Sequence, residues 1–321
     1  MSGPFGSSQW MYSSGGFYDF PIEQSLRFND DDTAYLGKSF ATTGTDRKKI
    51  TFSFWYKKTT IGTINQLYNN FNGTNEYGQI TIQSDDKLEV FSRTAGGTSY
   101  GRTTSAQLRD PSAWYHIVVS IDTTQATADD RIKIYINGVL QTSFAINSIP
   151  PQNTEMGYFI SGRTTAIGRR ADGGASSHNL DGYLAEYHVI DGTAYAASDF
   201  GEFKSGVWIP KDPSGLTYGT NGFRLSFADS SNIGDDTSGN TNDWTANNLA
   251  ATDVLPDSPT NNFAVLNPLA QAVNSSTAES NLYWSPSTSV DGHIEGTTAQ
   301  SSHKYHFDVV LCTTRQGHHL S

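Results

Sequence analysis

Cysteine and long apolar segments are almost absent from the sequence. The single cysteine, Cys312, cannot form a disulfide within one chain, and it cannot build a cysteine-based metal site alone. No stretch approaches the roughly 20 apolar residues of a transmembrane helix. Residues 1–20 contain no Lys or Arg and no continuous apolar run, so they do not resemble a secretory signal. We therefore expect folding in a reducing compartment, without membrane insertion.

Basic residues are also scarce. The chain has 21 Lys and Arg against 32 Asp and Glu, which gives a formal net charge of −11, and its basic residues are scattered. Proteins that bind nucleic acids cluster Lys and Arg to neutralise phosphates, so we expect no nucleic-acid partner. No Walker A loop, dinucleotide-binding fingerprint or H-E-x-x-H zinc motif occurs either.

Short alternating patterns joined by turn residues take the place of these features. In RIKIYINGVLQTSF (131–144), isoleucines alternate with polar residues, and Asn137-Gly138 supplies the two positive-φ positions of a type I′ turn. This pattern predicts a hairpin, and QITIQSDDKLEVFSR (79–93) predicts a second one. Further strands are predicted at 51–58 and 114–122, whereas no amphipathic helix of three turns is found. The sequence therefore predicts an all-β protein, an antiparallel β-sandwich or jelly roll.

Composition divides the chain into four parts. Residues 1–20 are predicted to be a flexible or docking arm, and residues 21–200 hold enough strands for one sandwich. Residues 201–270 are interrupted by Pro, Gly and Asn, which predicts a loop-rich extension packed on that sandwich. Residues 271–321 are rich in Ser and Thr, and only HKYHFDVVL (303–311) has a strand pattern. This last part is expected to be an incomplete or strand-exchanged β domain.

An ordered set of motifs resembles a known family. The motifs are FYDFPIEQSLRFNDDDTAYLGKSF, DRKKITFSFWYKK, WYHIVVSID, RIKIYINGVLQ, IGRR and LDGYLAEYHVIDG. Together they are similar to concanavalin A-like, laminin G-like lectin/glucanase domains, in the version that recurs in virion structural proteins of tailed phages, especially marine ones. Residues 231–268 resemble the segment that follows the domain in those proteins. The resemblance covers about residues 17–268 and implies a concanavalin A-like jelly roll.

The same resemblance implies a function and partners. It implies a virion component assembled in the host cytoplasm, a tail or capsid fibre part that contacts other virion proteins. A homo-oligomer is expected, with a trimer favoured because fibres are commonly trimeric. The lectin-like domain would recognise a host-surface glycan. Two alternatives stay open: a polysaccharide-degrading glucanase-like enzyme, and a purely structural capsid decoration protein.

The stretch NLDGYLAEYHVIDG (179–192) bears on the enzyme alternative. Its carboxylates, Asp181, Glu186 and Asp191, are five residues apart, so successive ones would lie on opposite faces of a strand, with the outer pair roughly 33 Å apart. Glycosidases need two carboxylates about 5 to 9.5 Å apart. The family's hydrolases have an E-x-D-x-E pattern, which is absent. Glu186 and His188 do share a face, which we interpret as a mixed polar face near a sheet edge, and we expect no enzymatic activity.

Aromatic residues near loops rich in Asn and Gly are the candidates for glycan binding. The C–H face of a sugar packs on an aromatic ring, while polar side chains bind its hydroxyl groups. The candidates are Tyr68, Phe71, Tyr77, Tyr100 and Tyr158. The alternative is that these aromatics fill the core of the sandwich or an interface between protomers.

Acidic pairs at predicted turns are candidates for a calcium site, and Ca²⁺ is the one cofactor that the sequence suggests. Clustered oxygen ligands suit Ca²⁺, and the family resemblance adds that laminin G-like domains often bind it. The preferred ligands are Asp30, Asp32 and Asp181. Asp is also a common turn residue whose side chain caps its own backbone, so the alternative is purely structural. For DDTSGNTND (235–243), this structural interpretation is favoured.

Overall fold

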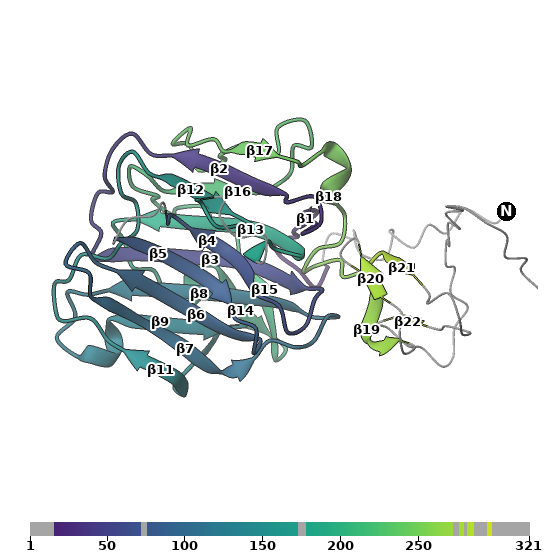
Figure 1. Cartoon of the computed structure of the whole chain (residues 1–321), viewed down its shortest axis with the longest axis horizontal. Helices are drawn as coiled ribbons and strands as arrows, with labels where there is room; N and C mark the ends of the chain where they lie inside the picture. The colour runs from purple at the N-terminus through teal and green to yellow at the C-terminus, as the bar shows by residue number, and fades with distance from the viewer. Residues whose placement is uncertain are drawn as a thin grey trace, which may run out of the picture.

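The computed structural model describes residues 16–71, 76–172, 178–271, 276–278, 281–285 and 294–296. Two antiparallel sheets of eight strands each pack face to face, with short two-stranded pairs beside them (Figure 1). Helical structure in these residues includes the short 3₁₀ turns η2 (Ala128–Asp130), η4 (Ala197–Asp199) and η5 (Ala251–Asp253). None of the helices described is long and apolar enough to cross a membrane. The predicted all-β antiparallel sandwich is confirmed.

One sheet, here called sheet A, has the strand order β10-β9-β8-β3-β13-β1-β18, and β16 also pairs with β13. Its strands are β1 (Ser25–Phe28), β3 (Lys49–Lys58), β8 (Trp114–Asp122), β9 (Ile132–Ile136), β10 (Val139–Leu140), β13 (Gly182–Asp191), β16 (Phe223–Leu225) and β18 (Val254–Leu255). The strands predicted at 51–58 and 114–122 are β3 and β8. The predicted 131–144 hairpin is β9 and β10, joined by Asn137 at φ 48° and Gly138 at φ 75°, as a type I′ turn requires.

The other sheet, sheet B, has the order β11-β7-β6-β5-β4-β12-β2-β17. Its strands are β2 (Tyr35–Ser39), β4 (Asn65–Asn69), β5 (Tyr77–Ile82), β6 (Lys87–Arg93), β7 (Ser99–Gln107), β11 (Phe144–Ser148), β12 (Thr164–Ile167) and β17 (Thr245–Asn247). Strands β5 and β6 form the predicted 79–93 hairpin. Along β6, buried and partly exposed residues alternate. Sheet B therefore packs one face on the core and leaves the other open to solvent.

Sheet A is buried on both faces. Phe52, Phe54 and Tyr56 of β3 point into the core between the sheets. The next residues along the strand point outward, and Trp55 belongs to a second apolar cluster with Trp114 and Tyr183. Residues before β1 and the hairpin of β14 (Gly201–Lys204) and β15 (Val207–Pro210) cover this outer face. Sheet A is thus the middle layer of the molecule.

Residues 201–270 contribute strands to both sheets. Strands β16 and β18 extend sheet A, and β17 pairs with β2 at the edge of sheet B. A buried cation ties this part to β3: the Lys57 ammonium donates to Asp257, Asn262 and the carbonyl oxygen of Phe263, each at 2.8 Å. Burial lowers the pKa of Lys57, while Asp257 opposes that shift. The pairing satisfies a charge that would otherwise be costly to bury.

From residue 266 onward the structure describes short strands. Strand β19 (Leu266–Gln271) pairs with β22 (Ile294–Gly296), and β20 (Ser276–Ala278) pairs with β21 (Tyr283–Ser285). The strand predicted at 303–311 lies outside the described residues, as do residues 1–15 of the arm.

Candidate functional site

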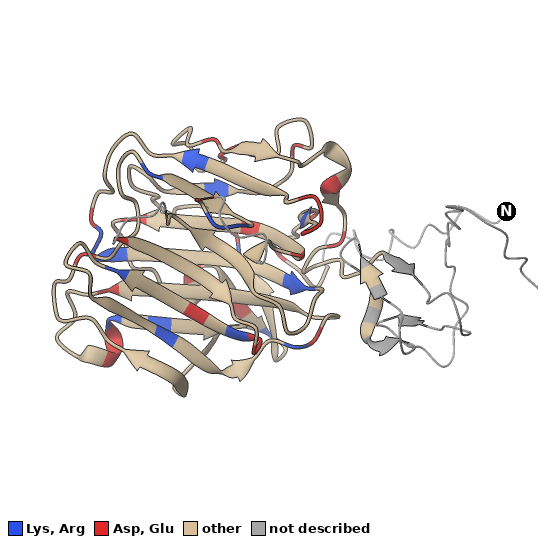
Figure 2. Ribbon diagram, viewed as in Figure 1, with Lys and Arg blue, Asp and Glu red and all other residues tan. Residues whose placement is uncertain are grey.

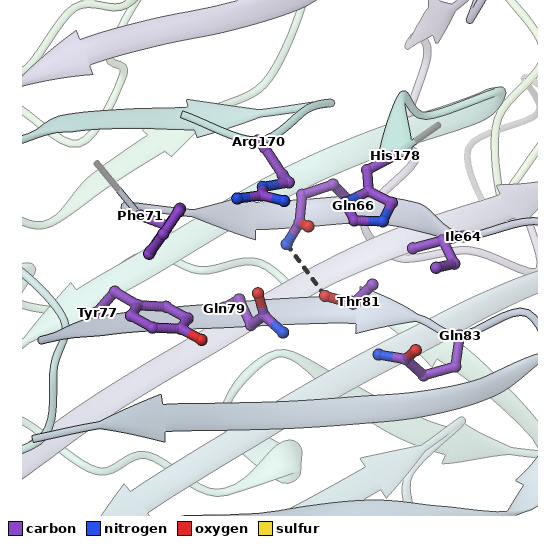
Figure 3. Close-up of a pocket in the computed structure, with 9 residues that line it drawn as sticks. All are labelled: Ile64, Gln66, Phe71, Tyr77, Gln79, Thr81, Gln83, Arg170 and His178. Atoms are coloured by element: carbon purple, nitrogen blue, oxygen red, sulfur yellow. Dashed lines mark hydrogen bonds between the residues drawn. The ribbon is translucent and has the colours of Figure 1, made fainter. Parts of the chain in front are cut away.

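A cavity of about 260 Å³ opens on the outer face of sheet B (Figure 3). It is lined by residues in or directly beside β4 and β5 and by residues of the segment after β12: Ile64, Gln66, Phe71, Tyr77, Gln79, Thr81, Gln83, Arg170 and His178. Strand alternation creates its floor, because Tyr77, Gln79 and Thr81 point outward while Ile80 and Ile82 are fully buried in the core.

Amide side chains are fixed across the floor of the cavity. Gln66 Nε2 donates to Thr81 Oγ1 at 3.0 Å and to the carbonyl oxygen of Tyr68 at 2.8 Å. The Gln79 and Gln83 amides both donate to Glu89 Oε1, at 3.0 and 2.9 Å. Burial raises the pKa of Glu89, although these two hydrogen bonds act in the opposite direction. The floor therefore holds two hydrogen-bonded groups, Gln66 with Thr81 and Gln79 with Gln83 through Glu89, in which each amide has a set orientation.

Aromatic rings form one end of the cavity. The rings of Phe71 and Tyr77 meet edge to face with centroids 4.8 Å apart, and Phe91 lies 5.4 Å beyond Tyr77. The Arg170 guanidinium carbon lies 4.9 Å from the Phe71 ring centre, and its charge is offset by Asp172, 2.8 Å away. Rings and a stacked guanidinium give this end an amphipathic surface without a strong net charge.

His178 lines the cavity beside Arg170. Its Nδ1 is buried and has no hydrogen-bond partner among the described residues. Burial lowers the pKa of His178, and the nearby Arg170 lowers it further. The ring is therefore neutral at pH 7 and can exchange hydrogen bonds with a hydroxyl group. Together, the cavity offers rings, amides and a neutral imidazole, which suits an uncharged ligand rich in hydroxyl groups.

The structure brings two of the five predicted aromatics, Phe71 and Tyr77, together at this cavity. Tyr68 and Tyr158 are fully buried, so their prediction as glycan-stacking residues is wrong. A bulge in β4 turns two consecutive side chains, Leu67 and Tyr68, into the core. Tyr158 packs there too, 5.2 Å from the ring of Phe52, and its hydroxyl donates to the carbonyl oxygen of Phe91.

Tyr100 is not part of the cavity. It pairs with Ser92, whose hydroxyl accepts a hydrogen bond from the buried backbone N–H of Gly157. Neighbouring Phe91 points the other way, toward Tyr77. By strand alternation, Tyr100 therefore lies on the opposite face of the sheet from the site.

The predicted calcium ligands do not come together. Asp30 and Asp32 are exposed in the loop after β1, where Asp32 accepts a hydrogen bond from Asn29, whereas Asp181 is 4% exposed beside β13. Within the described ranges, no group of three or more His, Cys, Asp or Glu side chains is placed to hold a metal ion. For residues 235–243 the turn interpretation is confirmed, because Asp236 accepts backbone hydrogen bonds from Arg224, Ser238 and Asn242.

A second polar cluster lies under the outer covering of sheet A. Glu186, at φ 44°, sits in a bulge of β13 that places it on the same outer side as its neighbour Ala185, and His188 lies on that side too. Their shared face is confirmed, since His188 Nε2 lies 3.2 Å from Glu186 Oε2. The expected sheet edge is wrong: β13 lies between β3 and β1, and residues far along the chain cover it.

Glu186 is held as an ionised structural group. Burial alone would raise its pKa, but His188 and the Arg224 guanidinium, which donates to both carboxylate oxygens at 3.0 Å, lower it. The adjoining cavity measures only about 10 Å³, room for at most one water molecule.

Ser53 and His116 in the same cluster resemble a nucleophile and its base. Ser53 Oγ lies 3.0 Å from His116 Nε2, but Trp208 Nε1, which can only donate, lies 2.9 Å from Nδ1. The proton of the neutral ring is therefore on Nε2, which donates to Ser53 and cannot accept its proton. Burial lowers the pKa of His116 to about 3, so the ring is neutral.

Known proteins resemble the described fold. Residues 29–198 match the family model of the concanavalin A-like lectin/glucanases superfamily. Among solved structures, the native heptameric SAP-like pentraxin from Limulus polyphemus is 16% identical over 55% of this chain and 78% of its own, with a TM-score of 0.39. Mouse laminin alpha1 domains LG4-5 are 11% identical over 60% of this chain and 50% of their own, with a TM-score of 0.38.

The Ruminococcus gnavus IT-sialidase CBM40 is 14% identical over 56% of this chain and 96% of its own, with a TM-score of 0.38. At these identities the similarity concerns the fold alone. No curated protein sequence matches the chain.

Proposed function

The chain belongs to the concanavalin A-like lectin/glucanase superfamily, and from that premise we propose that it is a non-enzymatic protein that binds a glycan in the sheet B cavity. The observation that carries the proposal is the pairing of the Phe71 and Tyr77 rings with an ordered floor of amides. A pyranose would place its C–H face on the rings, and its hydroxyl groups would reach Gln79, Gln83 and His178.

The charge of the cavity favours a neutral sugar. Arg170 is paired with Asp172, and Glu89 is engaged by two amides, so neither presents a free charge to the ligand. Figure 2 shows Lys and Arg interspersed with Asp and Glu over the sandwich instead of gathered in one field. Selectivity would therefore come from hydrogen-bond geometry and ring stacking.

A geometric argument supports the non-enzymatic part of the proposal. Of the residues that line the cavity, none is Asp or Glu, and Glu89, which contacts Gln79 and Gln83, has no second carboxylate among them. Glu186, the other candidate, is bonded to Arg224 under the covering of sheet A. A glycosidase needs an acid and a second carboxylate facing the same bond.

We further propose that the chain acts in a phage virion, in a fibre of the tail or capsid, as a trimer that contacts other virion proteins and a host-surface glycan. The resemblance of its ordered motifs to tailed-phage structural proteins supports this role. An open, shallow site would bind one sugar weakly, and several copies on one particle would raise the avidity by 10²-fold or more. Cryo-electron microscopy of purified particles tests the location, and a subunit buried inside the particle would favour the decoration role instead.

Glycan binding is tested by comparing the wild-type protein with Tyr77→Ala and Tyr100→Ala on an array of neutral polysaccharides. Tyr77→Ala removes the stacking surface and is expected to weaken binding about tenfold, because a well-placed aromatic contact contributes about 0.5–1.5 kcal/mol beyond burial. Tyr100→Ala is the matched control on the opposite face and is expected to retain wild-type affinity.

The same samples report on catalysis. No new reducing ends are expected during prolonged incubation with each bound polysaccharide. Equal binding by the wild type and Tyr77→Ala would contradict the proposed site, and cleavage would contradict the non-enzymatic assignment.

A further inference from the structure

A second, larger hollow of about 450 Å³ lies on the other side of the molecule, between the β14–β15 hairpin and the β9–β10 turn. It is lined mainly by aromatic and aliphatic side chains: Tyr18, Trp55, Trp114, Asn137, Val139, Phe203, Gly206, Val207, Trp208, Pro259 and Asn262. No charged residue is among them. The hollow is independent of the proposed glycan site, because it belongs to the covering of sheet A.

Several polar groups in its wall are engaged within the chain. Trp208 Nε1 donates to His116, and Trp114 Nε1 donates to Asp257 at 3.2 Å. Asn262 accepts from Lys57 and donates to the carbonyl oxygen of Ser112. These groups therefore have partners within the chain, whereas the apolar side chains of Val139, Phe203 and Val207 in the same wall remain exposed.

Exposed apolar side chains concentrate around this hollow. Eight large hydrophobic residues are exposed in the described part of the chain: Phe17, Val139, Leu140, Ile146, Phe203, Val207, Phe263 and Leu282. Three of them line the hollow, and Phe17, Leu140 and Phe263 adjoin lining residues in the sequence. Such clustering marks an interaction surface, whereas scattered apolar residues do not.

The sequence before the described part fits this surface. The chain reaches the hollow at Tyr18, which lines it, and Lys204 of the hairpin pairs with Asp19 at 2.9 Å. Residues 1–15, MSGPFGSSQWMYSSG, contain no Asp, Glu, Lys or Arg but carry the consecutive apolar residues Trp10, Met11 and Tyr12. Tyr12 precedes Tyr18 by six residues, and an extended chain covers about 3.3–3.6 Å per residue, so the reach is roughly 20 Å.

We propose that Trp10, Met11 and Tyr12 dock in the hollow of their own chain. A segment tethered beside its site has an effective concentration in the millimolar range, which makes even weak apolar contacts sufficient. Burial of Trp10 beside Trp208 and Val207 would cover the exposed apolar surface and complete the outer layer over sheet A.

Photo-crosslinking in the full chain tests this docking. Trp10 is replaced by p-benzoylphenylalanine, and the crosslinked peptides are mapped by mass spectrometry. Crosslinks to 137–140 and 203–208 within one molecule are expected. Val207→Asp, which places a charge at the hollow, is expected to lower their yield about tenfold. Ile146→Asp is the matched control, since Ile146 is exposed to a similar degree, 55% against 49%, on β11 of sheet B.

Mixing isotopically light and heavy protein separates the remaining outcomes. Crosslinks that join a light chain to a heavy chain in the hollow would show that the occupant comes from a second copy, and would overturn docking within one chain. Crosslinks elsewhere, or an equal yield in Val207→Asp, would overturn docking altogether. Unchanged melting temperatures of Val207→Asp and Ile146→Asp show that both variants remain folded.

Discussion

A single hydrogen bond decides the chemistry of His116. The indole N–H of Trp208 fixes the proton of the ring on Nε2, and thereby turns a serine–histidine contact into a structural one. Sequence patterns cannot show this, because Trp208 lies 92 residues away along the chain. A serine close to a histidine is therefore weak evidence for catalysis until the hydrogen-bond partner of the second imidazole nitrogen is known.

His116 also makes folding stability depend on pH. Its folded-state pKa of about 3 lies below the unfolded value of about 6.5, so below pH 6.5 the unfolded chain binds a proton that the folded chain does not. The free energy of unfolding is expected to fall by up to about 1.4 kcal/mol per pH unit from pH 6.5 toward pH 3 through this group. Buried His188, whose pKa is also lowered by burial, acts in the same direction.

Urea unfolding of the wild type and His116→Gln at several values between pH 7 and pH 4 measures this effect. In His116→Gln, the free energy of unfolding is expected to change less with pH than in the wild type. The difference is the contribution of one proton, whatever the absolute stability of the variant. His178→Gln is the control, because His178 is only half-buried and should change the slope less. A slope in His116→Gln identical to that of the wild type would refute the assignment.

At the scale of elements, turns and alternating strands were predictable, whereas bulges were not. The Asn137-Gly138 turn and the outward Tyr77 follow from local rules of φ and alternation. Tyr68 and Glu186 break alternation, because each lies at a register shift set by pairing with a neighbouring strand. The amides of the site were missed for another reason: Gln79 and Gln83 are ordinary strand and turn residues in the sequence, and their connection depends on Glu89 of the next strand.

The turn between β9 and β10 is expected to tolerate only glycine at position 138. A Cβ atom at Gly138 would lie 2.2 Å from the ring of Trp208, and its φ is 75°. Gly97→Ala is the matched control, since Gly97 has φ 80° but its Cβ would meet only Arg93 at 3.7 Å. In both variants the free energy of unfolding should fall by about 1–2 kcal/mol, because alanine is disfavoured in the left-handed region. Gly138→Ala should lose about 1–3 kcal/mol more through overpacking. Denaturant unfolding measures the difference, and equal losses would show that Trp208 moves freely.

At the scale of the whole molecule, the structural parts of the chain differ from the parts that its composition predicts. Residues 201–270 look loop-rich because their strands have only two to six residues, yet β16, β17 and β18 complete both sheets. Which strand such short segments join depends on contacts with residues some 200 positions earlier, which no local pattern encodes. The sandwich was predictable from sequence, but its middle layer, buried on both faces, was not.

Truncation tests whether the later strands are integral. A chain ending at residue 200 loses Asp257, Asn262 and Phe263, which leaves the Lys57 ammonium without partners on an uncovered apolar face. Breaking a buried pair costs about 3–5 kcal/mol, a large part of the 5–15 kcal/mol that typically stabilises a domain. The 1–200 chain is therefore expected to lack a cooperative thermal transition, whereas a chain ending at residue 271 should retain one. Cooperative melting of the shorter chain at the wild-type temperature would make the extension dispensable.

The Lys57–Asp257 pair also affects when the protein can complete its fold during synthesis. A ribosome adds about 5–20 residues per second, so the 200 residues between the two partners take roughly 10–40 s to synthesise. During that interval β3 has emerged, but its cation and the neighbouring Trp55 have no cover. The nascent chain therefore carries an unfinished layer over this interval, and the layer is completed only after Asp257, Asn262 and Phe263 have left the exit tunnel.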